Sequence, residues 1–263
     1  MQFIVQGYPA YAYSGGVAFD PKLPAVVMVH GAAMDHSVWQ WQSRYLAHHG
    51  YAVAAVDLPA HGRSPGVARE RIEDLGAWIV GLLDAGGIER AALVGHSMGA
   101  LACLAATIAA PQRVGKLALL GACVPMAVSD AFLGAAREAP AVAFDMEAVW
   151  SHVRNSQLAS SAVPGAGLLN ATRALNDRSR AGVLATDLNA CNTYRPGEAA
   201  MKALSVPTLV LGGRRDVMTP PKANKALAAG IAGAKLVTVD AGHSMMSEAP
   251  RETLRALGDF LAA

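Results

Sequence analysis

Short runs of apolar residues recur along the chain, and segments of helical length separate them. The runs show no alternation with polar residues, which is typical of strands buried on both faces, as in a parallel sheet covered by helices. A regular alternation of strand and helix predicts an α/β fold with right-handed crossovers. The predicted strands are residues 25–30, 51–56, 91–94, 116–120, 207–211 and 235–239, and the predicted helices are residues 37–49, 72–85, 98–109, 220–232 and 248–261.

Two shorter apolar stretches precede this pattern. Residues 3–5 and 10–13 are separated by Gly7 and Pro9, residue types that favour a turn. We predict an antiparallel hairpin at one edge, which brings the twisted, mostly parallel sheet to eight strands. Further along, Thr219 precedes Pro220, and this pair predicts a helix N-cap followed by proline at the first helical position.

The rhythm of strand and helix stops after the sixth strand. Residues 123–204 contain no strand-like run, only helical fragments broken by proline and glycine. We therefore predict a helical cap or lid over residues 123–204, inserted into an α/β core made of residues 1–122 and 205–263. The helical fragments are residues 129–139, 144–157, 168–175 and 180–189.

Composition excludes several classes of protein. A chain of 263 residues that is 53% hydrophobic and 16% charged is not intrinsically disordered. Lys and Arg number 22 against 20 Asp and Glu, and aromatic residues make up only 6%, so we expect no nucleic-acid partner. Residues 91–110 lack charge, but Gly95, His96 and Ser97 interrupt them, so we expect no membrane span there.

Cysteine usage and the N-terminal residues bear on the compartment. Cys103, Cys123 and Cys191 are far apart, odd in number and form no CxxC pair, so neither a disulfide framework nor a structural zinc site is expected. The first residues lack the basic segment and the long apolar segment that make up a signal peptide. We expect a cytoplasmic protein with reduced, buried cysteines.

The pentapeptide Gly95-His96-Ser97-Met98-Gly99 fits the pattern G-x-S-x-G. This pattern is typical of a nucleophile elbow, in which serine occupies a sharp turn from a strand into a helix. A predicted strand precedes it and a predicted helix follows, which is the required context. We predict that Ser97 is a nucleophile, the alternative being a tight turn with an ordinary polar serine.

A serine hydroxyl needs a base to take its proton and a carboxylate to orient that base. In hydrolases with this elbow the chain order is serine, acid, histidine, and only His152 and His243 follow Ser97. His152 lies in the predicted insertion, whereas His243 follows the last predicted strand. Asp216 follows the strand before it, at the same sheet edge, so we predict Asp216 as the acid; a plain turn residue is the alternative.

The tetrahedral oxyanion needs two N–H donors, one from the residue after the nucleophile and one from a loop after an earlier strand. Met98 and Ala32 meet these requirements. A substrate pocket is predicted beside these groups, although for its tryptophans the sequence favours packing in the core or the cap. Its predicted lining residues are His30, Gly31, Trp39, Met126, Trp150 and Met245.

Together these motifs resemble the α/β-hydrolase fold superfamily, in its serine esterase or lipase branch with a helical cap. The landmarks that carry the resemblance are His30-Gly31, the stretch from Asp57 to Ser64 (DLPAHGRS), the elbow at Ser97, and Asp216 with His243. The resemblance implies a Ser97–His243–Asp216 triad and hydrolysis through an acyl-enzyme. Dehalogenases and epoxide hydrolases of the superfamily use aspartate at the elbow, so the serine argues against those reactions.

The sequence therefore predicts a serine hydrolase for carboxylic esters of small to medium, largely apolar substrates, with water as the second reactant. Thioester, lactone, amide or carbon–carbon bond hydrolysis on the same triad remains an alternative, as does a receptor that keeps the fold without catalysis. No cofactor and no metal are expected, because neither HExxH nor a phosphate-binding loop occurs. A monomer and a homodimer are equally compatible with the sequence.

Overall fold

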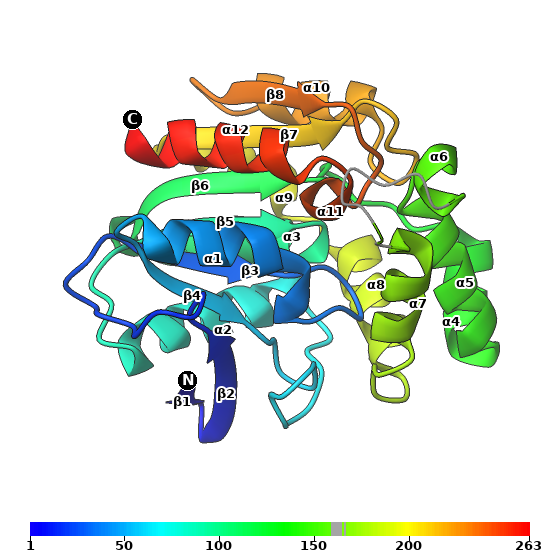
Figure 1. Ribbon diagram of the computed structural model, residues 1–263, viewed down its shortest axis with the longest axis horizontal. Helices are drawn as coiled ribbons and strands as arrows, with labels where there is room; N and C mark the ends of the chain where they lie inside the picture. The colour runs from blue at the N-terminus through cyan, green and yellow to red at the C-terminus, as the bar shows by residue number, and fades with distance from the viewer. Residues whose placement is uncertain (159–164, 166) are drawn as a thin grey trace.

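Eight strands form one sheet in the computed structural model, which describes residues 1–158, 165 and 167–263. The spatial order is β1-β2-β4-β3-β5-β6-β7-β8. Strands β3 to β8 are parallel, whereas β1 and β2 form an antiparallel hairpin that joins the sheet through β4 (Figure 1). The bounds are β1 Gln2–Val5, β2 Tyr8–Tyr13, β3 Ala25–Val29, β4 Ala52–Val56, β5 Ala91–His96, β6 Val114–Leu120, β7 Thr208–Gly213 and β8 Lys235–Val239.

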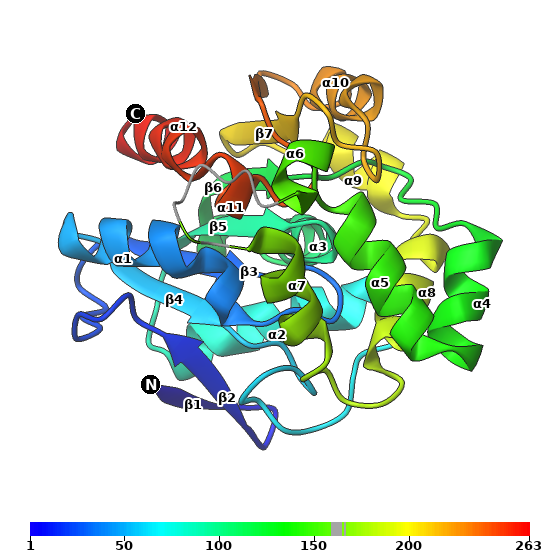
Figure 2. The ribbon, with the colours of Figure 1, turned by 45° about the vertical axis from the view of Figure 1, so that its right-hand side comes forward.

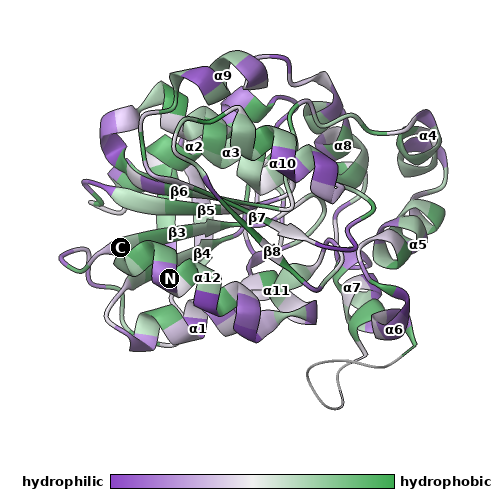
Figure 3. Ribbon diagram, turned by 90° about the horizontal axis from the view of Figure 1, so that it is seen from above, coloured by the Kyte–Doolittle hydropathy of each residue, from purple (hydrophilic) through white to green (hydrophobic). Residues whose placement is uncertain are grey.

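Helices cover both faces of this sheet, so each central strand is buried on both sides. In β3, Val27 and Val29 belong to one apolar core, while Val26 and Met28 belong to the other. This explains why the strand runs lack polar alternation. Figure 3 shows α2 (Ile72–Ala85), α3 (Met98–Ala109) and α10 (Pro221–Ala229) on one face, and α1 (Gln40–His48), α11 (Met245–Glu248) and α12 (Pro250–Ala262) on the other. The predicted eight-stranded α/β fold is confirmed.

Six helices lie between β6 and β7 in the part of this segment that the structure describes. We refer to the first five as the cap helices: α4 Asp130–Glu138, α5 Pro140–Trp150, α6 Arg154–Gln157, α7 Leu168–Asn176 and α8 Val183–Thr193. They lie beyond the carboxyl ends of the parallel strands (Figures 1 and 2). The sixth, α9 (Gly197–Ala203), packs against α3 of the sheet-covering layer, and the fragments expected from the sequence do not include it.

Two of the helix starts that differ from the sequence-based expectation have a clear physical reason. Helix α10 begins at Pro221 with Pro220 at the N-cap, one residue later than expected, because the Thr219 hydroxyl donates to Asp216 at 2.6 Å instead of capping the helix. Pro140, expected to break a helix, instead opens α5 at its first position, where the missing N–H removes no hydrogen bond. Within the described ranges, no helix is both long enough and apolar enough to cross a membrane.

Candidate active site

Ser97 occupies the junction between β5 and α3 with a left-handed φ of 52°. A non-glycine residue rarely adopts this conformation, and it persists only when its surroundings impose it. Here the strand and the helix approach so closely that a Cβ on Gly95 would clash with the backbone of Gly99, and one on Gly99 would clash with the carbonyl groups of β3 and the residue after it. The two glycines thus allow the sharp turn that presents the Ser97 hydroxyl at the N-terminus of α3.

His243 and Asp216 form a buried pair at the ends of β8 and β7. The Nδ1 atom of His243 lies 2.8 Å from Oδ2 of Asp216. The Asp216 carboxylate also accepts the Thr219 hydroxyl at 2.6 Å and the N–H groups of Met218 and Thr219 at 2.8 and 2.9 Å. Burial raises the pKa of Asp216, but the charge of His243 and the hydrogen bonds from His243 and Thr219 outweigh it, so the pKa is lowered. Asp216 is therefore ionised at neutral pH and can fix the proton on Nδ1 of His243.

The histidine that precedes the nucleophile supports the loop of His243. Nε2 of His96 donates to the backbone carbonyl of His243 at 3.0 Å. Burial and then the charge of His243 lower the pKa of His96 to about 3, so this ring stays neutral. Gly121, just after β6, leaves little room beside both rings: a Cβ there would lie 3.1 Å from Cε1 of His243 and 3.3 Å from Nε2 of His96. The imidazole of His243 thus packs against the ends of the neighbouring strands β5 and β6.

The His243 loop is also fastened to the cap helices. The N–H of Ser244 donates to the carbonyl of Ser151 at 2.9 Å. The Glu248 carboxylate accepts the N–H of Gly242 at 2.6 Å and the N–H of Val153 at 2.9 Å. One buried carboxylate therefore bridges the loop that carries the base and the junction between α5 and α6.

Ser97 and His243 open onto the same cavity, which has a volume of about 360 Å³. Within the described part of the chain, the Ser97 hydroxyl has no hydrogen-bond partner, as is common in active sites without substrate. Of the predicted pocket residues, Gly31, Met126 and Trp150 line this cavity. Its other lining residues are Ala32, Met34, His96, Ala127, Val128, Ser129, Phe132, Glu147, Leu188, Cys191, Val217, Met218 and Thr219.

The remaining predicted pocket residues, His30, Trp39 and Met245, do not line the cavity, and the expectation is corrected. Trp39 and Met245 are fully buried in the apolar core on the α1 and α12 face of the sheet, away from the cap helices. His30 is buried and accepts the N–H of Leu58 at Nε2, at 3.1 Å. Burial and the neighbouring His61 lower the pKa of His30 to about 4, so it acts as a neutral link between the loops after β3 and β4.

The two N–H groups predicted for the oxyanion have no acceptor within the residues that the structure describes. Met98 is the first residue of α3, where helix geometry leaves the N–H without an intrahelical partner. Ala32 lines the cavity, and the next residue, Ala33, has a φ of 52° and donates its N–H to Asp187 at 2.9 Å. Asp187, on α8, also pairs with Nε2 of His61 at 2.8 Å. A buried carboxylate of the cap helices thus holds the loop of Ala32.

Asp187, Glu147 and Thr219 were not predicted as site residues. For Glu147 the sequence holds a signal, because it lies four residues after Ala143 and next to Ala148, both buried, on a helix whose only other charged residue is Asp145. An acidic residue on a buried helical face is rare unless it is paired or functional. For Asp187 and Thr219 the sequence holds no comparable signal. The partners of Asp187 are far away in the sequence, and Thr219 contacts Asp216 within a turn.

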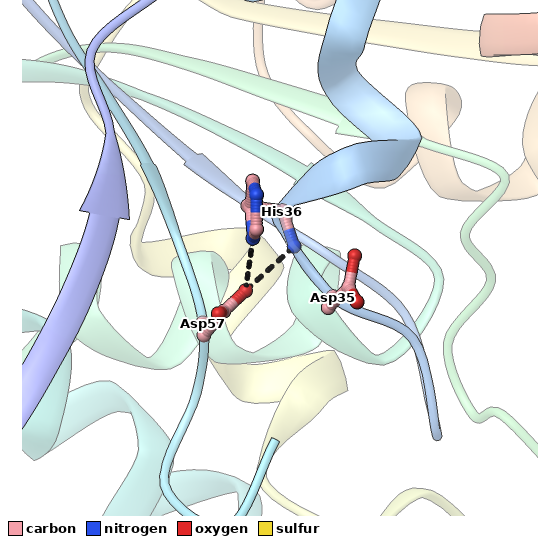
Figure 4. A group of neighbouring side chains, drawn as sticks. All are labelled: Asp35, His36 and Asp57. Carbon is pink, nitrogen blue, oxygen red and sulfur yellow. Dashed lines mark hydrogen bonds and ion pairs between the residues drawn. The ribbon is translucent and has the colours of Figure 1, made fainter. Parts of the chain in front are cut away.

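Asp35, His36 and Asp57 lie together near the end of β4 (Figure 4) and offer ligand atoms within 4.8 Å of one another. Their atoms are already engaged in hydrogen bonds. One oxygen of Asp57 accepts both the backbone N–H and Nδ1 of His36, each at 2.7 Å. Asp35 accepts the N–H of Ser37 at 2.8 Å and the Arg178 guanidinium at 3.1 Å. These hydrogen bonds hold the loops after β3 and β4 together.

Comparison with known proteins agrees with the fold. A family model described as the alpha/beta hydrolase fold matches residues 24–250. A 2-hydroxy-6-oxononadienedioate/2-hydroxy-6-oxononatrienedioate hydrolase of Paraburkholderia xenovorans is 30% identical over 262 residues, which cover 90% of this chain and 86% of that protein. The crystal structure of the enol-lactonase from Burkholderia xenovorans LB400 superposes with a TM-score of 0.88 at 22% identity, over the full length of both chains.

Other relatives match more strongly but over a shorter stretch. A 2-hydroxy-6-oxononadienedioate/2-hydroxy-6-oxononatrienedioate hydrolase of Pseudomonas putida is 44% identical over 101 residues, so this chain spans only 35% of that relative's length. The family model, by contrast, covers both β3 and the loop of His243. The chain therefore belongs to the alpha/beta hydrolase fold family.

Proposed function

We propose that this chain is a serine hydrolase that cleaves uncharged carboxylic esters through an acyl-enzyme. The observation that carries the proposal is that Ser97, in its left-handed turn, lines the same cavity as His243, which is paired with Asp216. A hydroxyl at a helix N-terminus, an imidazole and a buried carboxylate are the components of acyl transfer by a triad. The roles of Ser97, His243 and Asp216 are proposed on this basis.

In the first half of the reaction, the Ser97 oxygen attacks the ester carbonyl while Nε2 of His243 takes its proton. Asp216 holds the proton on Nδ1, which leaves Nε2 free to act as base, and it stabilises the imidazolium that forms. The N–H groups of Ala32 and Met98 stabilise the oxyanion. His243 then gives its proton to the leaving alcohol.

In the second half, a water molecule attacks the acyl-enzyme, and His243 acts again as base. The same two N–H groups hold the second oxyanion, and His243 returns the proton to Ser97 as the acid leaves. The hydrogen bond between His96 and the His243 carbonyl keeps the imidazole in place through both halves.

The charge of the cavity favours an uncharged ester over the dioate that the similar hydrolases are named for. Neither Lys nor Arg occurs among the residues that line the cavity, and residues 159–164 and 166, outside the described ranges, contain neither. A carboxylate in such a cavity would lose its hydration without gaining a cation. Most of the wall is apolar, with Phe132 packing edge-on against Trp150 at a centroid distance of 5.3 Å.

The proposal is tested with a panel of short-chain phenyl esters alongside a lactone, a thioester and a diketone, and by labelling with a fluorophosphonate. We expect ester turnover and labelling, both lost in Ser97→Ala. Ser244→Ala is the matched control for labelling, because Ser244 lies in a second Gly-His-Ser-Met sequence and should leave the label in place. Turnover of the diketone in preference to every ester would replace the proposed reaction, and labelling without any turnover would point to a receptor.

A further inference from the structure

Glu147 is the only carboxylic acid among the residues that line the cavity. It belongs to α5 of the cap helices and is only 4% exposed. The mechanism above does not use it. A buried carboxyl group in a substrate cavity therefore lacks an assigned role.

Glu147 accepts fewer hydrogen bonds than Asp216 and Asp187, the other buried carboxylates near the cavity. Asp216 accepts hydrogen bonds from His243, Thr219 and the backbone, and Asp187 accepts two. Glu147 accepts one hydrogen bond, at Oε2, from Nδ2 of Asn176 at 3.2 Å. Its other oxygen, Oε1, has no partner in the described part of the chain. Among the described residues no cation lies against it, so this site is built for a protonated carboxyl group and not for an anion.

The electrostatic surroundings agree with this geometry. Burial and then the charge of Asp187 on α8 raise the pKa of Glu147, while the hydrogen bond from Asn176 on α7 lowers it, with a net value of about 8. Glu147 is therefore mostly protonated at neutral pH. Because Asn176 donates to Oε2, the proton belongs on Oε1, the oxygen that has no partner among the described residues.

We propose that Glu147 determines substrate specificity by donating its carboxyl O–H to an oxygen acceptor on the acyl chain of the ester. The inference rests on the proposed ester hydrolysis and adds the substrate class: an uncharged acyl group that carries a carbonyl, ether or hydroxyl oxygen. A chain that carries a carboxylate is rejected, because Asp187 lies close by and the cavity has no cation to pair with it.

The test compares matched esters by their kcat/KM values. Phenyl 4-oxopentanoate is compared with phenyl pentanoate, which lacks the acceptor, and with monophenyl succinate, in which a carboxylate replaces the ketone at the same position. A second set consists of phenyl 6-oxoheptanoate, phenyl heptanoate and monophenyl adipate. In this set the acceptor lies further along the acyl chain from the ester carbonyl. Spontaneous hydrolysis is subtracted in each case.

For the wild type we expect the oxo esters to be preferred over the alkyl esters, and the carboxylate esters to be disfavoured by about 100-fold or more, as for an unpaired charge in a cavity. In Glu147→Leu the preference for the oxo ester should fall about fivefold, the usual effect of one lost hydrogen bond. Glu147→Gln keeps an N–H donor at the same place and should keep most of the preference. Exposed Glu138→Gln, on α4, is the matched control and should leave all ratios unchanged.

The ratios separate specificity from structure, because a damaged fold lowers the turnover of both esters in a pair equally. An oxo-to-alkyl ratio that is the same in the wild type and in Glu147→Leu would overturn the inference, since the carboxyl proton would then be used inside the protein, at the unpartnered Oδ1 of Asn176. A wild type that prefers carboxylate esters would overturn it as well. If the wild type hydrolyses none of the six esters, the proposed function itself fails, a result distinct from either of these.

Discussion

Replacing Glu147 by Gln should change how the stability of the protein depends on pH. In the folded protein, burial and Asp187 raise the pKa of Glu147 from 4.5 to about 8. In the unfolded chain the carboxyl group ionises near its ordinary pKa. Between these two values the folded state holds one proton more than the unfolded state, so the stability that depends on this group is complete below pH 4.5 and is lost as the pH rises towards 8.

The expected size follows from the linkage relation. Each pH unit inside this window reduces the free energy of unfolding by about 1.4 kcal/mol per group, so two units amount to about 3 kcal/mol. Glutamine cannot titrate and contributes no such slope. Asp187 and Asn176 near this carboxyl group are present in both proteins, so their effects cancel in the difference. Between pH 5.5 and 7.5, Glu147→Gln should therefore gain about 3 kcal/mol relative to the wild type.

The measurement is urea unfolding followed by tryptophan fluorescence at pH 5.5, 6.5 and 7.5, at constant ionic strength, with linear extrapolation to water. Glu138→Gln again supplies the control, since this exposed residue should give a difference from the wild type that does not change with pH. A pH-independent difference for Glu147→Gln would refute the reasoning, because it would mean that the carboxyl group ionises alike in the folded and unfolded states.

Three further substitutions test the proposed triad and the loop of the oxyanion. Asp216→Asn should lower kcat by roughly 10⁴-fold with little change in KM, measured on a phenyl ester, because the amide no longer fixes the proton on Nδ1 of His243. Thr219→Val removes the hydroxyl that donates to Asp216 and should lower kcat by about tenfold, while circular dichroism remains that of the wild type. Asp187→Asn should reduce the free energy of unfolding by about 3 kcal/mol, because His61 loses its buried ionised partner; a change below about 0.5 kcal/mol in urea unfolding would exclude this pair as a stabilising contact.

The sheet could be predicted from the sequence because its strands are buried on both faces and therefore read as unbroken apolar runs, as in β3 and β6. Local spacing also indicated the elbow, since Gly95 and Gly99 are required by the contact between one strand and the helix that follows it. These features depend on neighbours in the sequence. The positions of Asp216 and His243 after two successive strands followed from the same logic of parallel strand ends.

The wall of the cavity could not be predicted in this way. Trp39 is close in sequence to the oxyanion loop, and Met245 is close to His243. Both side chains nevertheless belong to the apolar core between the sheet and helices α1 and α12. Glu147 and Phe132 reach the cavity from the cap helices, whose packing depends on contacts between distant segments. Nearness along the chain to a catalytic position therefore says little about which side chains meet the substrate.

The bridge from Glu248 to the N–H groups of Gly242 and Val153 has a mechanical consequence. Together with the bond from Ser244 to Ser151, it ties the α5–α6 junction to the turn that holds the imidazole. A displacement of the α5–α6 junction away from the sheet would therefore also shift the loop that carries His243, the proposed base. In the proposed reaction, the position of the base therefore depends on the position of the α5–α6 junction.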